Sequence, residues 1–206
     1  LFEERIAEVP DRIDFFPTHE ENLGLYRFLA MQIAGRFACG TAPEAPAVWP
    51  RWKTELESDG SRAHLHDWFL LAEGVRVGVQ MAERFPGWSA QQPSLLARFC
   101  LRAREIDAGK QPSLPDWLLA WELAGEPLEV LPGPLQVAGA VVRTLSTPLR
   151  DPGATVDDSW NVAQLLAQAF RRLFAGAAEA DCAPASEVPN YLVPVDLFDG
   201  DGPIPD

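Results

Sequence analysis

The stretch 61-SRAHLHDWFLLAEGVRVGVQMAERFPG-87 decides the fold of this chain. Its apolar side chains recur at the three- and four-residue spacing of one helical face, which is typical of a core-facing helix. We predict a helix from about Ser61 to Phe85, ended by Pro86 and Gly87. Gly74 and Gly78 lie four residues apart on one side of it, which favours close packing of a second helix. The members of the apolar stripe are Leu65, Trp68, Phe69, Ala72, Val75, Val79 and Ala82.

Glu73 interrupts this helix between apolar turns, close to Gly74 and Arg76. Two interpretations are open. The carboxylate can form a buried or interfacial ion pair with a basic partner, which would have to offset the cost of removing both charges from water. Alternatively, it lies on a solvated face of the helix.

A second strong helix precedes this one along the chain. Thr18 and Glu21 have the spacing of a capping box at its start, and Gly40 suits a left-handed cap at its end. Its apolar face repeats every four residues, with Tyr26 and Ala30 expected beside that face. The residues of the face are Leu25, Leu29, Ile33 and Phe37, and Phe15 and Phe16 before the helix are predicted core anchors.

Further helices are predicted from Pro93, over 116–124, over 134–146 and from Thr155 onward. Thr155 and Asp158 have capping spacing, and Asp157 and Asp158 suit the positive end of the helix dipole. We find no strand alternation strong enough for a sheet. The expected fold class is therefore all-α, an irregular bundle of about six helices. We expect a helical domain at 1–178 and a Pro/Gly-rich acidic tail or linker at 179–206.

Charge and composition make some classes of binding partner unfavourable. The 206 residues are 47% apolar and carry a net charge of −13, more than half of it in the last 28 residues. This balance disfavours nucleic acid and anionic membranes, and we find no apolar run of the roughly 18 residues that a membrane span needs. Cys39, Cys100 and Cys182 form no close pair, which indicates free thiols in a reducing compartment. We therefore expect a cytoplasmic protein without membrane insertion.

No motif predicts catalysis. His64 and His66 stand two residues apart, so on a helix they point about 200° away from each other and cannot share a metal. Asp199 and Asp201 resemble the opening of a calcium loop whose later ligands are missing. The chain has no nucleophile elbow, P-loop or dinucleotide glycine pattern. We expect no catalytic residue, metal or cofactor, and hence not an enzyme.

Three stretches together resemble one family: 22-NLGLYRFLAMQIAGRFACGT-41, 68-WFLLAEGVRVGVQMAERFPG-87 and 154-ATVDDSWNVAQLLAQAF-170. They resemble, in order, three helices that precede the von Willebrand factor A domain in NorD/CbbO-type proteins. That family includes nitric oxide reductase activation proteins and the Rubisco activase subunit. The second stretch follows the family pattern E-D-x-R-I-D…Y-P-G at Glu73 and Arg76, but Gly74 and Gly78 replace both of its aspartates. The first stretch matches at Leu25, Tyr26, Ala30, Ala34, Gly35, Gly40 and Thr41.

The resemblance implies an adaptor for a MoxR-type AAA+ ATPase, which remodels or activates a client protein. The helical region would bind the ATPase ring, and the A domain would hold the client enzyme through a metal site. This chain has no D-x-S-x-S motif, so it would be the helical part alone. Because it begins at Leu1 and ends without a closing element, we expect a fragment of a longer protein. The candidate interaction residues are Tyr26, Glu73, Arg76, Asp157 and Asp158.

Two other functions stay open. The chain can be a stand-alone acidic interaction module of an immunity or regulatory type, whose charge would suit a basic target. It can also bind a small molecule in a pocket lined by tryptophans, although large aromatic side chains more often fill the core. The tryptophans in question are Trp68, Trp117, Trp121 and Trp160.

Overall fold

A computed structural model describes residues 13–41, 62–106 and 112–174. These ranges are helical and contain no strand, and six of their helices have eleven residues or more, so the predicted all-α bundle is confirmed. The predicted boundary at 178/179, the acidic tail and Cys182 lie outside the described residues. The elements are α1 (His19–Ala38), α3 (Arg62–Arg84), α4 (Pro86–Ser89), α5 (Gln92–Ala103), α6 (Leu114–Ala124), α7 (Gly133–Leu145) and α8 (Val156–Phe174), with short 3-10 helices η2 (Leu128–Val130) and η3 (Thr147–Arg150).

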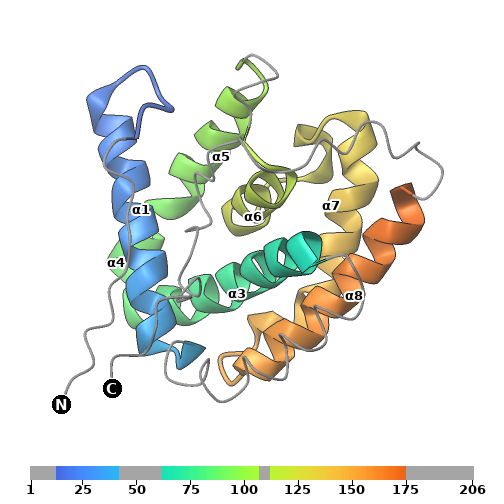
Figure 1. Cartoon of the computed structure of the whole chain (residues 1–206). Coiled ribbons are helices and arrows are strands. Elements are labelled where there is room, and N and C mark those ends of the chain that lie inside the picture. Colours follow the sequence, from blue (N-terminus) through green and yellow to red (C-terminus); the bar gives the residue numbers. More distant parts are fainter. Residues whose placement is uncertain (1–12, 42–61, 107–111, 175–206) are drawn as a thin grey trace, which may run out of the picture.

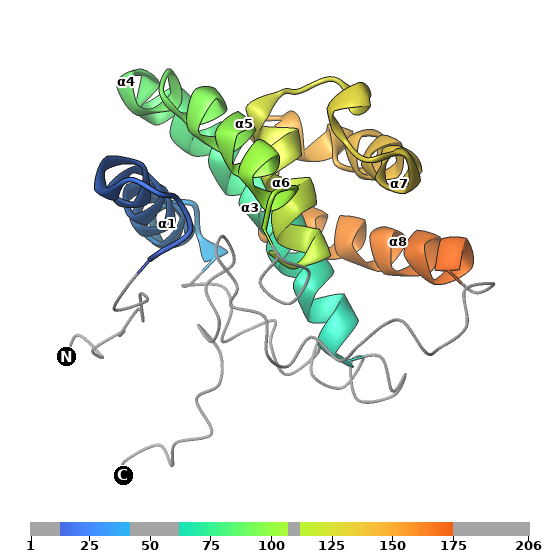
Figure 2. The ribbon, with the colours of Figure 1, turned by 90° about the horizontal axis from the view of Figure 1, so that it is seen from above.

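Helix α3 runs through the middle of the molecule (Figures 1 and 2). It packs against α1, α6, α8 and η3. Every residue from Trp68 to Gly78 is buried, whereas the sequence predicted one apolar stripe. A helix that is covered all round has no solvated face, so its charged residues must find partners inside the protein.

Helix α6 packs closely on α3 because two glycines leave room for it. A Cβ atom at Gly74 would lie 2.8 Å from Cδ2 of Leu119, and one at Gly78 would lie 2.8 Å from Cδ2 of Leu123. Real side chains do not approach this closely without a shift. The prediction that these glycines mark a helix contact is therefore confirmed.

Helix α1 begins and ends as predicted. The Oγ1 atom of Thr18 accepts a hydrogen bond from the backbone N–H of Glu21 at 3.3 Å, and Gly40 has a φ of 88°. Tyr26 and Ala30 are exposed rather than packed beside the apolar face, because α3 and α5 cover only one side of α1. The predicted core residues of this region, Phe15, Phe16, Leu25, Leu29 and Ile33, are all buried, and Phe37 is half-buried.

The tryptophans of the third functional alternative belong to the core. Trp68 packs on Phe170 with ring centroids 4.1 Å apart. Trp121 is enclosed, and its Nε1 donates to the carbonyl oxygen of Pro127 at 3.1 Å. Trp117 and Trp160 are buried as well, so all four side chains stabilise helix packing. None of the described helices is both long enough and apolar enough to cross a membrane.

Candidate functional site

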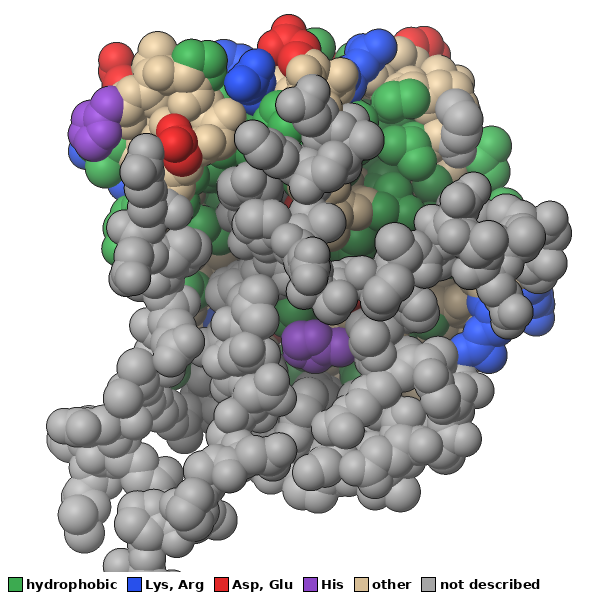
Figure 3. Space-filling view, turned by 45° about the horizontal axis from the view of Figure 1, so that its top comes forward, with side chains coloured by type: hydrophobic (Ala, Val, Ile, Leu, Met, Phe, Trp, Pro, Cys, Tyr) green, Lys and Arg blue, Asp and Glu red, His purple; other side chains and the backbone are tan. Residues whose placement is uncertain are grey.

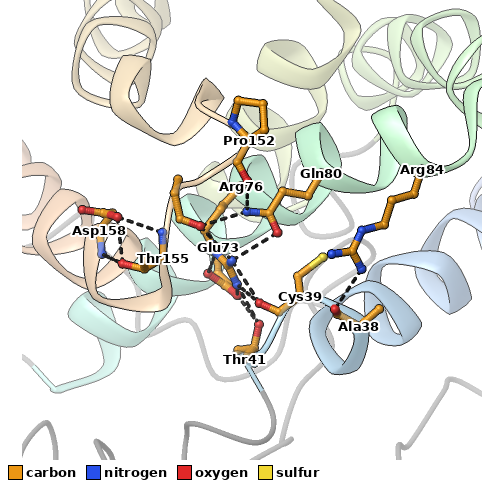
Figure 4. Close-up of polar contacts among 11 residues, drawn as sticks. Ala38, Cys39, Thr41, Glu73, Arg76, Gln80, Arg84, Pro152, Thr155 and Asp158 are labelled. Atoms are coloured by element: carbon orange, nitrogen blue, oxygen red, sulfur yellow. Dashed lines mark hydrogen bonds and ion pairs between the residues drawn. The ribbon is translucent and has the colours of Figure 1, made fainter.

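Glu73 lies at the centre of a buried polar cluster, which we call the α3 cluster and define as Thr41, Glu73, Arg76 and Gln80 (Figure 4). Glu73 and Arg76 form an ion pair one helical turn apart, with Arg76 Nε donating to Glu73 Oε2 at 2.9 Å. The Thr41 hydroxyl donates to Glu73 and accepts from Arg76. Of the two interpretations of Glu73, the buried ion pair is therefore correct.

The α3 cluster joins three segments that are far apart in the sequence. Arg76 donates to the carbonyl oxygen of Cys39, at the end of α1, and to that of Ala154, before α8. Gln80 donates to the carbonyl oxygens of Pro152 and Ala154 at 3.1 and 2.9 Å. Since buried carbonyl groups need donors, the cluster both satisfies these groups and fixes α1 and α8 on α3.

The cap of α8 lies beside this cluster. The Thr155 backbone N–H donates to Asp158 Oδ2 at 2.8 Å, and the Thr155 hydroxyl donates to the same oxygen at 2.7 Å. These hydrogen bonds, the backbone one first, hold the pKa of Asp158 below its usual value, and the nearby charge of Arg76 adds to the effect. The predicted capping pair is therefore confirmed, with Asp158 held as a carboxylate.

A second buried arginine, Arg36, has a different environment. It is 1% exposed, and none of its guanidinium nitrogens has a hydrogen-bond acceptor in the described part of the chain. Burial lowers its pKa to about 10, while the charge of Glu73 opposes that shift. Gln32, one turn earlier, is buried with both amide atoms unpaired among the described residues. Burial of a charge without a hydrogen-bond acceptor costs free energy, and the attraction of Glu73 offsets part of this cost at Arg36.

A second carboxylate cluster joins α6 to α7 and η3. The carboxylate of Glu122, buried on α6, accepts from Arg143 Nε at 3.1 Å, from the Ser146 hydroxyl at 3.3 Å and from Arg150. Arg143 also stacks over the ring of Trp121, 4.0 Å from its centroid. The Glu122 cluster, defined as Glu122, Arg143, Ser146 and Arg150, therefore fixes α7 and η3 on α6.

A small pocket adjoins the Glu122 cluster. Its volume is about 180 Å³, and it lies where α3 meets the start of α5, the end of α6 and η3. The apolar side of the pocket comes mainly from α3. Its polar side is formed by Gln92, Glu122 and Arg150, together with Ser89.

The described thiols do not have the properties of nucleophiles. Burial raises the pKa of Cys100 to about 12, and it also raises the pKa of Cys39, although Arg84 and Arg76 act in the opposite direction. Reactive cysteines need a lowered pKa. Among the described residues, no three His, Cys, Asp or Glu side chains are grouped closely enough to hold a metal ion.

The structure brings only some of the predicted site residues together. Glu73 and Arg76 are in direct contact, and Asp158 lies near Arg76. Tyr26 lies thirteen residues before Cys39, roughly 20 Å along α1, and Asp157 is exposed at the start of α8. Because Glu73 and Arg76 are fully buried, they can shape a binding surface but not touch a partner.

The sequence analysis missed the Glu122 cluster, Gln92 and the buried Arg36. One signal was present: Glu122 interrupts an apolar helix just as Glu73 does, and two arginines follow within 28 residues. Comparison of the chain with protein-family models, with curated proteins and with solved structures finds no match. The fold and these clusters define an all-α domain whose helices are joined by one fully buried ion pair, Glu73–Arg76, and by the buried carboxylate of Glu122 with two partly exposed arginines.

Proposed function

We propose that this chain is a non-catalytic adaptor domain that binds a MoxR-type AAA+ ATPase and supports the remodelling or activation of a client protein. The resemblance to NorD/CbbO-type proteins suggests this function, and the helical fold is compatible with it. In this proposal the domain contributes a binding surface and the ATPase supplies the chemistry.

One observation carries the proposal. The three stretches that resemble the family meet at the α3 cluster. The first stretch ends at Thr41, which bonds to Glu73 and Arg76 of the second, and the third begins at Ala154, whose carbonyl oxygen accepts from Arg76. If the family motif describes a packing arrangement that its members share, the motif residues should contact one another in the structure.

The outer face of α1 is the surface that we assign to the ATPase. Leu23 and Tyr26 are neighbours on this face, one helical turn apart, and both are exposed, Tyr26 at 37%. Tyrosine is frequent among the residues that dominate protein interfaces. Figure 3 shows hydrophobic side chains at the surface on the side where α7 lies. The other exposed large apolar side chains of the described residues are Phe85, Leu101, Val137, Leu165 and Leu173.

The test is direct binding of the full chain to a MoxR-type ATPase from the same genome, followed by biolayer interferometry at physiological salt. We expect a saturable complex that the Tyr26→Ala variant weakens about tenfold or more, as is usual for a central interface tyrosine. Leu101→Ala, on the exposed side of α5, is the matched control and should bind as the unmodified chain does. Absence of a complex, or equal effects of the two variants, would refute the proposal.

The alternative is a stand-alone acidic interaction module. The net charge of −13 favours it, because a strongly acidic protein attracts basic partners through long-range forces. Salt dependence separates the two functions. A complex that depends on Tyr26 and persists at high salt supports the adaptor. Binding to unrelated basic proteins that is lost at high salt supports the acidic module.

A further inference from the structure

The pocket beside the Glu122 cluster contains an unused hydrogen-bond donor. Gln92 is only 7% exposed, and its Nε2 atom has no acceptor among the described residues. Leaving such a donor buried and unpaired costs free energy. Gln92 lines the pocket, so a rotation of its amide that turns Nε2 toward the pocket would let a bound acceptor atom remove that cost.

The charges around the pocket favour an anion. Glu122 and Arg150 line the pocket with one charge of each sign. Arg143, which lies outside the lining, also pairs with Glu122, so the three side chains together carry a net positive charge. In the described part of the chain Glu122 is the only acceptor for Arg150, which leaves most of its five N–H groups for a ligand.

The remaining walls of the pocket are apolar, and the volume between them indicates the size of ligand that can be held against them. Val75, Val79 and Ala82 come from α3, and Leu123 comes from α6. The volume of about 180 Å³ is comparable with the roughly 150 Å³ apolar cavity that holds benzene, a molecule of six heavy atoms. A ligand of this size with a charged end and an apolar body fits both sides of the pocket.

We propose that this pocket binds a small organic carboxylate, with the carboxylate accepting from Gln92 and Arg150 and the short hydrocarbon body against α3. A planar carboxylate suits the fork of an arginine. Phosphate is the weaker candidate, because it carries more charge than the pocket neutralises and has no apolar part for the α3 wall. This site goes beyond the adaptor function and does not depend on it.

The experiment titrates the full chain with sodium isobutyrate by calorimetry and by saturation-transfer NMR. Isobutyramide, which has the same shape without the charge, and inorganic phosphate are the comparison ligands. We expect one isobutyrate to bind with a Kd on the order of 1 mM, as suits six heavy atoms. Isobutyramide and phosphate should each bind at least about tenfold more weakly.

Two variants locate the site. Gln92→Leu should weaken isobutyrate about tenfold, whereas Gln91→Leu, at the exposed neighbouring position, should leave it unchanged. Gln92→Leu removes an unpaired buried donor, so the free protein should stay folded, which circular dichroism checks. Ala82→Leu fills the pocket from α3 and should abolish binding. The proposal is overturned if the unmodified chain does not bind isobutyrate, if isobutyramide or phosphate binds equally well, or if Gln92→Leu and Ala82→Leu bind as the unmodified chain does.

Discussion

Glu73 and Arg76 stand one turn apart on α3 as an ion pair with almost no contact with water, being 0% and 1% exposed. Removal of one partner would leave the other charge buried and unpaired. We therefore expect Arg76→Met to lower the free energy of unfolding by about 3–5 kcal/mol. Urea denaturation followed by circular dichroism measures this change.

Two controls accompany the Arg76 experiment. Arg98→Met breaks an exposed ion pair with Glu21 and should cost no more than about 1 kcal/mol. The double variant Glu73→Gln/Arg76→Met removes both charges, so it should be less destabilised than Arg76→Met alone. If the double variant is the less stable of the two, an unpaired Glu73 charge is not what destabilises the single variant.

Arg36 should respond in the opposite direction. Its guanidinium is buried without an acceptor in the described part of the chain, so at pH 7 it adds a desolvation cost. We expect Arg36→Met to raise the free energy of unfolding by about 1–3 kcal/mol. Because burial holds the folded pKa at about 10, below its unfolded value, this cost is fully present below pH 10. The difference between the two proteins should shrink as the pH rises above 10. A loss of stability in Arg36→Met at pH 7 would contradict this account.

The contrast between Glu73 and Glu122 shows what the sequence could predict. Apolar spacing gave the helices and most buried faces, because periodicity depends on local geometry. The apolar spacing did not decide between the two interpretations of Glu73. The Glu73–Arg76 pair is buried because α1 and the chain before α8 cover it, and this is a tertiary contact. The partners of Glu122 lie 21 and 28 residues further on, and no local pattern connects them. The pocket is likewise formed by the meeting of α5, α6 and η3, which depends on tertiary packing.

The Glu122 cluster should be less sensitive than the α3 cluster. Glu122→Gln leaves Arg143 and Arg150 without a carboxylate, but these side chains are 36% and 48% exposed, so water can solvate them. We expect a loss of about 1–3 kcal/mol in the free energy of unfolding. Glu129→Gln, on the exposed part of η2, should change stability by less than about 0.5 kcal/mol. If Arg76→Met and Glu122→Gln lower the free energy of unfolding equally, the exposure of the charged groups that remain does not determine the cost of losing the ion pair.

The contact of α1 with α3 predicts a strict requirement for glycine at position 35. A Cβ atom there would lie 2.4 Å from Cγ1 of Val77 and 2.9 Å from Cγ of Met81. Valine is stiff, so the helices must move apart, and Gly35→Ala should cost about 1–3 kcal/mol. At Gly87 a Cβ atom would meet nothing within 4 Å, so Gly87→Ala is the control and should be neutral or slightly stabilising. A thermal melt that ranks Gly87→Ala below Gly35→Ala would refute the close contact.

The cap of α8 gives a pH-dependent prediction. Thr155 donates two hydrogen bonds to Asp158, which keep the folded pKa of this carboxyl below its unfolded value of about 3.9. A depressed carboxyl pKa contributes stability that is present above the unfolded pKa and is lost as the pH falls through the folded pKa. The stability difference between the unmodified chain and Asp158→Asn should therefore be constant well above the unfolded pKa and should shrink as the pH falls below it through the folded pKa.

Thr155→Ala removes the hydroxyl and should cost about 0.5–2 kcal/mol at pH 7. Asp157→Asn is the matched control, since it removes a charge at the same helix end without touching the cap hydrogen bonds. Urea titrations at a series of pH values measure all three variants. If Asp157→Asn shows the same pH dependence as Asp158→Asn, the effect comes from the helix dipole acting on any first-turn charge. If only Asp158→Asn shows it, the hydrogen bonds from Thr155 are responsible, because a dipole alone would act on both carboxylates. We expect this second outcome, since both Thr155 hydrogen bonds go to Asp158.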